Sequence, residues 1–292
     1  MVRPNLQELA ARAGGTPVTR FAPSPTGYLH LGHVVNAIYV WGIARALGGR
    51  VLLRIEDHDR IRSRSIFERA LLEDLDWLGF VPDEGRTPVR RQSDDLPAYA
   101  RALDGLRVTH HVYACDCSRR EIGGERYSGR CRARALNEAP GRGVRVEINE
   151  GAETFDDGLR GRVTQVPSED SGDLLLRDRD GHWTYQFAVT VDDIRDNVTL
   201  VIRGADLLPS TGRQIRLARV LGRDDPPSFL HHPLITGSSG AKLSKSNRDT
   251  GVRELRAAGV TPGDVIGRAA SAIRLVPPHT PIEAAEVERL FR

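Results

Sequence analysis

The sequence of 292 residues has no apolar run that approaches the roughly 20 residues a membrane-spanning helix needs. Residues 1–15 also lack the apolar segment of a secretory signal. Charged residues make up 28% and hydrophobic residues 39%, which argues against a disordered chain. We therefore expect a folded cytoplasmic protein with about two domains, on a prior of roughly 150 residues each.

Cysteine is almost absent, and all three cysteines lie within one stretch of seventeen residues, at Cys115, Cys117 and Cys131. In a cytoplasmic protein this clustering favours a thiolate metal site over disulfide bonds. Tetrahedral zinc takes four ligands, so a further side chain is required. The candidates nearby are His110, His111, Glu125 and Tyr127. Reduced cysteines without a metal are the alternative explanation.

Lysine is rare beside arginine, although the formal net charge is only +3. Clustered arginines are suited to contacts with phosphates. The clusters are Arg60, Arg62 and Arg64; Arg119 and Arg120; and Arg130, Arg132 and Arg134. Solvated surface charge is the alternative explanation for each cluster.

A glycine-rich G-x-G-x-x-G loop is also missing, yet residues 18–56 predict the β-α-β unit in which such a loop occurs. An apolar strand at 18–22 leads into a turn with Pro23, Pro25 and Gly27, a helix follows from Gly32 to residue 47, and residues 51–55 form a second strand. The start of a helix in such a unit binds anionic ligands. Here it carries two imidazoles, His30 and His33.

Further elements are predicted along the chain. Ser65 and Glu68 indicate a capping box for a helix that ends at Gly79, with Ile66, Ala70, Leu71, Leu75 and Leu78 as its apolar face. Another helix starts near Leu96, and short strand-like runs between 144 and 180 indicate an inserted, partly β domain. The later elements are strands at 198–202 and 229–235 and helices at 210–221, 252–259, 262–275 and 281–292.

Charged side chains follow two of the predicted strands. Glu56 belongs to the acidic run 54–59 after the second strand, and Arg203 follows the strand at 198–202. Ligands bind at the carboxyl ends of strands in open α/β sheets. Helix capping or solvated loop charge is the alternative for the acidic run.

Two motifs together resemble the signatures of class I aminoacyl-tRNA synthetases. His30-Leu-Gly-His33 is similar to HIGH, and Lys242-Leu-Ser-Lys-Ser246, about 210 residues later, is similar to KMSKS. Either motif alone is weak, since paired histidines are often helix caps and lysine-serine loops are often solvated. The resemblance implies ATP binding by His30, Gly32, His33 and Lys245, with His30, His33, Lys242 and Lys245 as catalytic residues.

The turn R-F-A-P-S-P-T-G at 20–27 and the motif R-I-E-D at 54–57 are similar to those of glutamyl-tRNA synthetases, whereas glutaminyl enzymes carry a P-E-P-N version of the turn. The resemblance implies a glutamate site in which Arg203 pairs with the side-chain carboxylate. Its residues are Arg20, Phe21, Ala22, Pro23, Ser24, Glu56, Tyr185 and Arg203.

The chain ends where full-length glutamyl-tRNA synthetases continue into an anticodon-reading domain, and residues 205–211 resemble the truncated paralogues of the glutamyl-Q tRNA(Asp) synthetase family. The resemblance implies an ATP- and Mg²⁺-dependent enzyme that activates L-glutamate without tRNA and transfers it to the queuosine of tRNA(Asp). We expect a monomer. It also implies one zinc ion on Cys115, Cys117, Tyr127 and Cys131.

The fold that the resemblance implies is α/β, a Rossmann-type parallel sheet with an inserted α+β acceptor-type domain. The expected boundaries are 16–105 and 183–250 for the two catalytic halves, 106–182 for the inserted zinc-bearing domain and 251–292 for a helical segment. Two alternatives stay open. One is a truncated glutamyl-tRNA synthetase that esterifies a tRNA 3′ end, and the other is a non-catalytic module that binds tRNA or nucleotide.

Overall fold

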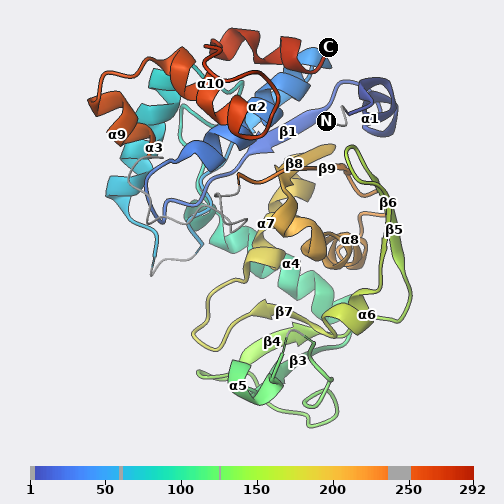
Figure 1. The fold of residues 1–292 in the computed structure, drawn as a ribbon. Coiled ribbons are helices and arrows are strands. Elements are labelled where there is room, and N and C mark those ends of the chain that lie inside the picture. Colours follow the sequence, from blue (N-terminus) through green and yellow to red (C-terminus); the bar gives the residue numbers. More distant parts are fainter. Residues whose placement is uncertain (1–3, 59–61, 125, 236–250) are drawn as a thin grey trace.

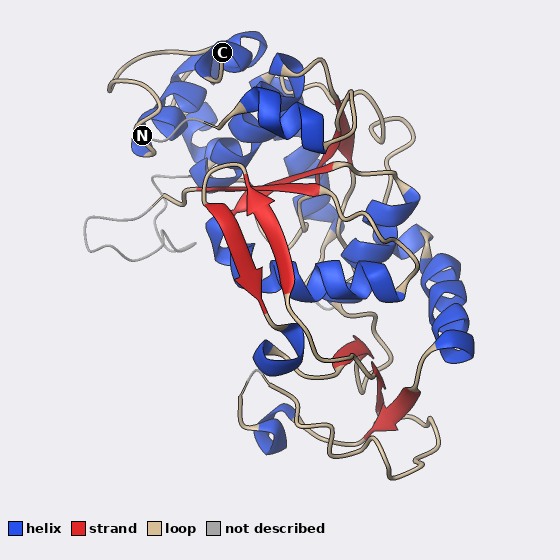
Figure 2. Cartoon of the chain, turned by 90° about the vertical axis from the view of Figure 1, so that its right-hand side faces the viewer, coloured by secondary structure: helices blue, strands red, loops and turns tan. Residues whose placement is uncertain are grey.

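A computed structural model describes residues 4–58, 62–124, 126–235 and 251–292. The described N- and C-terminal parts lie at one end of the molecule, and a small sheet lies at the other (Figures 1 and 2). A short helix, α1 (Leu6–Arg12), precedes the first strand. No helix in these ranges is long and apolar enough to cross a membrane.

The predicted β-α-β unit is confirmed. Strands β1 (Val18–Phe21) and β2 (Arg50–Leu53) are parallel, with Val18 opposite Arg50, and α2 (Leu31–Ala46) connects them. Helix α2 ends where Gly48 adopts a φ of +66°, a left-handed conformation that glycine tolerates. The helix is buried along most of its length, because helices cover it on one side and strands on the other.

A second sheet has the strand order β6-β5-β9-β8. Strands β8 (Leu200–Gly204) and β9 (Ser228–His232) are parallel, while β5 (Glu153–Asp157) and β6 (Gly161–Gln165) form an antiparallel hairpin. The N–H of Thr199 donates to the carbonyl of Val18 at 2.9 Å, which joins this sheet to β1. Helices α7 (Tyr185–Arg195), η2 (Ala205–Ser210) and α8 (Thr211–Val220) accompany it.

A third, antiparallel sheet has the order β3-β4-β7, from Val112–Cys115, Gly143–Val146 and Leu174–Arg177. The single-turn η1 (Gln92–Asp94) and then α4 (Leu96–Thr109) lead into it. The short helices α5 (Arg119–Ile122) and α6 (Pro167–Asp170) lie between its strands in the sequence. The strands within 106–182 thus divide between two sheets, since the β5–β6 hairpin pairs with β9.

The chain closes with α9 (Val252–Ala257), α10 (Pro262–Ala272) and η4 (Ala284–Leu290), a 3₁₀ helix where the sequence indicated an ordinary helix. Phe291 packs its ring against Tyr39 of α2, with centroids 5.0 Å apart. Helices α10 and η4 pack on α2, while α9 and α3 (Ser65–Leu78) contribute further residues to the main hydrophobic core.

The predicted capping box at the start of α3 is wrong. The carbonyl of Arg64 already accepts the first helical hydrogen bonds, so the helix begins one residue earlier than a cap at Ser65 requires, and Arg64 makes no side-chain cap. The carboxylate of Glu68 instead pairs with Arg91 at 2.7 Å. Ile66 was assigned to the apolar face but is 55% exposed, whereas Leu71 and Leu75 are buried as expected.

Candidate active site

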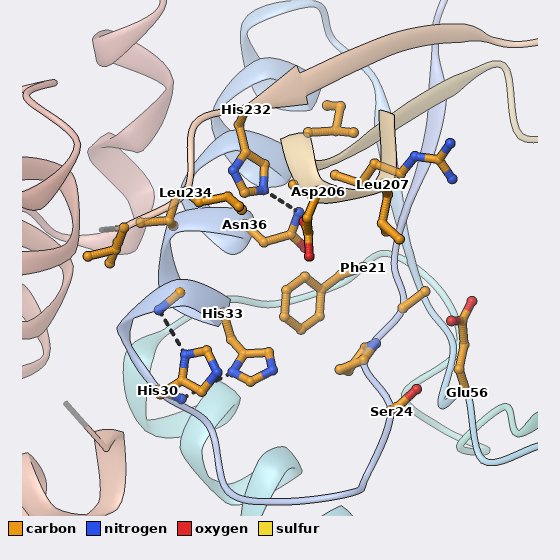
Figure 3. Close-up of a pocket in the computed structure, with 18 of the residues that line it drawn as sticks. Phe21, Ser24, His30, His33, Asn36, Glu56, Asp206, Leu207, His232 and Leu234 are labelled. Carbon is orange, nitrogen blue, oxygen red and sulfur yellow. Dashed lines mark hydrogen bonds between the residues drawn. The ribbon is translucent and has the colours of Figure 1, made fainter. Parts of the chain in front are cut away.

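A cavity of about 320 Å³ opens at the carboxyl ends of the parallel strands, beside the start of α2 (Figure 3). Parallel strands end at the same edge of a sheet, so residues distant in sequence meet there. All of the predicted glutamate and ATP residues within the described ranges line it: Arg20, Phe21, Ala22, Pro23, Ser24, His30, Gly32, His33, Glu56, Tyr185 and Arg203. Lys242 and Lys245 lie outside the described residues.

The two imidazoles cap helix α2. The Nδ1 atom of His30 accepts the N–H of Gly32 at 3.0 Å, and Nδ1 of His33 accepts the N–H of His30 at 3.1 Å. A neutral imidazole that accepts at Nδ1 carries its proton on Nε2. The ring centroids are 4.0 Å apart, so two Nε2–H donors stand side by side at the positive end of the helix dipole. The capping bonds therefore also orient the two rings.

A buried charge network lies under the cavity. Arg54 is 1% exposed and donates to Glu56 at 3.1 Å and to Asp193 at 2.8 Å. Asp193 also receives the Nε–H of Arg20 at 3.2 Å. Burial alone raises the pKa of Asp193, but the charges of Arg20 and Arg54 outweigh it and hold the pKa below its usual value. The network fixes one cation and one carboxylate at the cavity wall, Arg20 and Glu56.

Arg203 enters the cavity from β8 and is 4% exposed. Its Nη1 donates to Gln214 at 2.6 Å, its Nη2 to Thr211 at 2.8 Å and its Nε to His231 at 3.0 Å. Burial lowers the pKa of Arg203 below its usual value. Burial also raises the pKa of Tyr185, a cavity residue, and the carboxylate of Glu56 adds to that rise. The phenol therefore stays neutral near pH 7.

Sequence analysis missed part of the lining. His232 ends β9, and burial lowers its pKa to about 4, so its ring is neutral. Its Nδ1–H donates to the carbonyl of Pro233 at 2.9 Å, and Nε2 then accepts from Asn36 of α2 at 3.0 Å. Asp206 and Leu207 line the cavity from η2. The position of His232 at the end of a strand could have identified it as a cavity residue, since Arg203 lies near the end of β8 in the same way.

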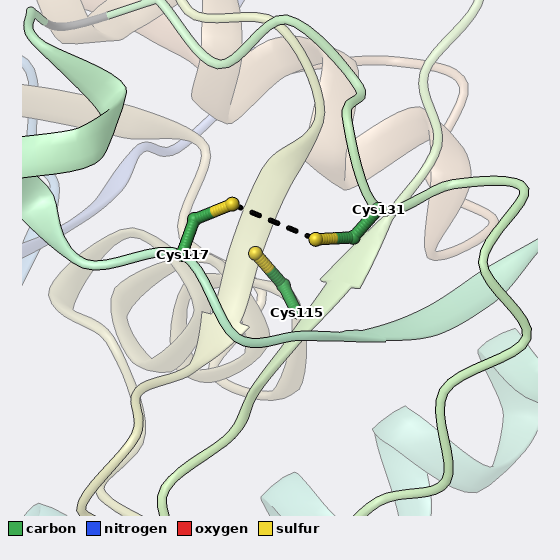
Figure 4. Close-up of side chains that lie close together, drawn as sticks. All are labelled: Cys115, Cys117 and Cys131. Carbon is green, nitrogen blue, oxygen red and sulfur yellow. Dashed lines mark hydrogen bonds between the residues drawn. The ribbon is translucent and has the colours of Figure 1, made fainter.

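The three cysteines meet beside the small sheet, all reduced and buried (Figure 4). Their sulfur atoms lie within 4.8 Å of one another, with Cys117 and Cys131 at 3.5 Å. The hydroxyl of Tyr127 lies 3.4 Å from the sulfur of Cys115 and accepts the N–H of Cys131 at 2.9 Å. Three sulfurs around one tetrahedral zinc are about 3.8 Å apart for bonds of roughly 2.3 Å, so the spacing fits such an ion.

The other candidates for the fourth ligand are placed differently. His110 bonds to Thr109, and His111 pairs with Glu147 at 2.8 Å; Glu125 lies outside the described residues. Carboxylates also pair with arginines of the cluster at 130–134. Arg132 pairs with Asp173 at 2.8 Å and Arg134 with Asp116 at 2.6 Å. These two arginines brace the cysteine region.

Comparison with known families identifies the class of protein. Residues 17–266 match the family described as tRNA synthetases class I (E and Q), catalytic domain. The chain belongs to this family.

Particular relatives are of two kinds. The chain is 39% identical over 285 residues to the glutamyl-Q tRNA(Asp) synthetase of Nitratidesulfovibrio vulgaris, covering 90% of this chain and 88% of the relative. It is also 39% identical over 265 residues to glutamate–tRNA ligase 2 of Cereibacter sphaeroides, covering 85% of this chain but 58% of the relative.

Among solved structures, a glutamate tRNA ligase from Elizabethkingia meningosepticum in complex with its amino acid superposes with a TM-score of 0.78 and 28% identity. The match covers 94% of this chain and 64% of that one. The chain thus spans less than two thirds of these glutamate–tRNA ligases. Its fold is the class I synthetase fold, α/β with a mixed, largely parallel sheet.

Proposed function

We propose that this chain, as a monomer, activates L-glutamate with ATP without tRNA and transfers the glutamate to the queuosine base in the anticodon of tRNA(Asp). The observation that carries the first step is the convergence of Arg20, Glu56 and Arg203 with His30 and His33 on one cavity. The acceptor in the second step is the one for which the Nitratidesulfovibrio relative, a glutamyl-Q tRNA(Asp) synthetase, is named. The resemblance of residues 205–211 to that family supports it, since Asp206 and Leu207 line the cavity.

The charges suit a zwitterion with a second carboxylate. The carboxylate of Glu56 pairs with the substrate ammonium, while Arg20 and Arg203 offer guanidinium groups to carboxylates. Arg203 reads the side-chain carboxylate, which the amide of glutamine cannot replace without losing an ion pair. Opposite charges at fixed positions hold the amino acid in one orientation.

In activation, an oxygen of the α-carboxylate attacks the α-phosphorus of ATP, and the bond to the departing pyrophosphate breaks. The Nε2–H groups of His30 and His33 donate to phosphate oxygens as negative charge develops. Lys242 and Lys245 supply further positive charge to the same phosphates, and Mg²⁺ accompanies ATP as part of the substrate. In transfer, a hydroxyl of the cyclopentene diol of queuosine attacks the glutamyl carbonyl, and AMP leaves.

Zinc is part of the proposal, with Cys115, Cys117, Cys131 and Tyr127 as its ligands. The spacing of the thiols and the place of the Tyr127 hydroxyl among them support this set. When bound, the ion supplies a structural crosslink. We assign the ion to the inserted acceptor-type domain over 106–182, in which the β3-β4-β7 sheet lies beside the cysteines. In this division the catalytic halves are 16–105 and 183–250, and 251–292 is the helical segment.

The second candidate is esterification of the 3′ end of a tRNA. Equal identity to the Cereibacter glutamate–tRNA ligase favours it as the competing activity. Both acceptors present a diol, so the cavity chemistry is the same for each.

The test uses labelled glutamate and ATP with three RNAs: tRNA(Asp) containing queuosine, the same tRNA without queuosine, and tRNA(Glu). Nuclease digestion then maps the label. We expect label on queuosine alone, and glutamate-dependent pyrophosphate exchange with no RNA present. Label on the 3′ adenosine of tRNA(Glu) replaces the proposal with the second candidate, and absence of exchange overturns the activation step.

A further inference from the structure

Arg203 donates a hydrogen bond to His231, a residue that has no role in the proposed chemistry. Its guanidinium has five N–H groups, and the bonds to Gln214, Thr211 and His231 use three of them. One N–H on each terminal nitrogen stays outside these three bonds, and the hydroxyl of Tyr185, another cavity residue, also interacts with this guanidinium. The Nε–H is used by His231, so only the terminal nitrogens of the guanidinium can donate to a ligand in the cavity.

His231 is itself fixed by Asp157. Both side chains are fully buried, and the imidazole Nδ1 lies 2.6 Å from Oδ2 of Asp157. Because a carboxylate only accepts, the ring proton is on Nδ1, and Nε2 is left as an acceptor. Arg203 donates to it, and the hydroxyl of Thr211 lies 3.1 Å from the same atom. Burial lowers the pKa of His231, which keeps the ring in this neutral form.

Both carboxylate oxygens of Asp157 accept hydrogen bonds, which fix the orientation of the side chain. Its Oδ2 also accepts the backbone N–H of His231 at 3.0 Å, and its Oδ1 accepts the N–H groups of Leu159 and Arg160 at 3.0 and 2.9 Å. The two latter residues form the turn of the β5–β6 hairpin. One carboxylate therefore ties the hairpin turn, strand β9 and the guanidinium of β8 into a single arrangement.

We propose that Asp157 and His231 are positioning residues that aim Arg203 at the side-chain carboxylate of the substrate and so set the preference for glutamate over glutamine. The inference rests on the proposed function for the substrate, and it adds a second layer of residues to the site. Asp157 selects the tautomer, His231 supplies the acceptor, and Arg203 loses little further freedom when a carboxylate binds. A guanidinium without the acceptor leaves a buried N–H unpaired and tilts toward other partners.

Two substitutions at one position separate this role from simple packing. In His231→Gln the amide oxygen reaches the place of Nε2 and can accept from Arg203, while the contact with Asp157 is lost. In His231→Asn the amide N–H reaches the place of Nδ1 and bonds to Asp157, while the acceptor for Arg203 is lost. His231→Gln removes the bond of the imidazole to Asp157, whereas His231→Asn removes the acceptor that Arg203 and the hydroxyl of Thr211 share. The Tm of each variant is therefore measured beside its kinetics as the stability control.

Pyrophosphate exchange is measured with glutamate and with glutamine for each variant. We expect His231→Asn to raise the KM for glutamate and to lower the glutamate preference roughly tenfold or more, since an unpaired buried donor carries a cost of that order. His231→Gln should keep the preference within about threefold, and the KM for ATP should not change in either. Wild-type preference in both variants, or equal losses that follow equal falls in Tm, overturns the inference.

Crystal structures of the two substrate-free variants give a readout that does not depend on activity. The guanidinium of Arg203 should move in His231→Asn and stay in place in His231→Gln. An unmoved guanidinium in His231→Asn contradicts the positioning role. If the wild-type protein shows no glutamate-dependent exchange, the proposed function fails by itself, while the structures still decide whether His231 holds Arg203.

Discussion

The Nε–H of Arg20 lies 3.2 Å from both carboxylate oxygens of Asp193, although 173 residues separate them in sequence. Asp193 also holds Arg54, which in turn holds Glu56. The two substrate-facing charges therefore share one buried anchor. Such a network is costly to break on one side, because removal of one partner leaves the other charge uncompensated.

Asp193→Asn should lower kcat/KM for glutamate in pyrophosphate exchange by about 2 to 4 kcal/mol of transition-state stabilisation, or roughly 30-fold or more. The amide leaves Arg20 without its carboxylate, so the cavity wall no longer presents a fixed cation. The matched control is Asp196→Asn, since Asp196 pairs with Arg54 at 3.0 Å. Equal losses in the two variants would mean that general destabilisation, rather than the position of Arg20, explains the effect.

Arg203→Ala should cost about 2 to 5 kcal/mol in the activation of glutamate, because the side-chain carboxylate then enters a buried pocket without a partner. The same substitution should change the rate with glutamine much less. Exchange kinetics with both amino acids measure the difference. Near wild-type exchange with glutamate would show that another residue reads the carboxylate.

The local motifs were predictable because each depends on a few neighbouring residues. The strand, turn and helix at 18–46 follow from proline, glycine and apolar spacing, and the family resemblance predicts Arg20, Glu56 and Arg203, which all line the cavity. The spacing of residues in the sequence does not show which strand ends lie together. The fold brings the carboxyl ends of the parallel strands to one edge of the sheet.

Other features depend on partners distant in sequence. Glu68 pairs with Arg91 instead of capping its own helix, and no local pattern shows that preference. The β5–β6 hairpin lies within the segment expected as an insertion, yet it pairs with β9 through Asp157 and Phe229. His231 and Asn36 were missed for the same reason, since their partners come from other elements.

Asp74 gives the folded protein a pH dependence. Burial in α3 raises its pKa from 3.8 to about 6, against the lowering effect of Arg256 and Arg253. The native state then binds more protons than the unfolded state between these values, so this contribution is full below pH 3.8 and is lost as pH rises through 6. Asp74→Asn should remove about 1 kcal/mol of the stability difference between pH 5 and pH 8.

Urea unfolding of wild type and Asp74→Asn at the two pH values measures that difference. Asp192, whose pKa burial also raises to about 6, contributes with the same sign in both proteins and cancels. Asp76→Asn is the control, since Asp76 is on the same helix with its side chain 55% exposed. An unchanged pH dependence in Asp74→Asn would assign the effect to other groups.

Metal analysis of the untagged protein should find about one zinc ion per chain, because three thiols and a phenol hydroxyl converge with tetrahedral spacing. Cys131→Ser should abolish stoichiometric zinc, while Tyr127→Phe should weaken binding against a chelator and retain the ring packed under Arg145. His111→Ala is the control, since His111 pairs with Glu147. Metal-free protein with reduced cysteines would contradict the zinc assignment.

Lys245→Ala should depress the rate of adenylate formation far more than it raises the KM for ATP, because a cation that meets the phosphates as charge develops lowers the barrier more than it tightens ground-state binding. Lys245→Arg keeps the charge and serves as the comparison. The sequence contains no lysine besides Lys242 and Lys245, so amine-reactive labelling modifies only these two side chains and the N-terminus. ATP with glutamate should protect both lysines from the reagent. Equal effects of Lys245→Ala on KM and rate, or labelling that ATP does not slow, would remove Lys245 from the proposed chemistry.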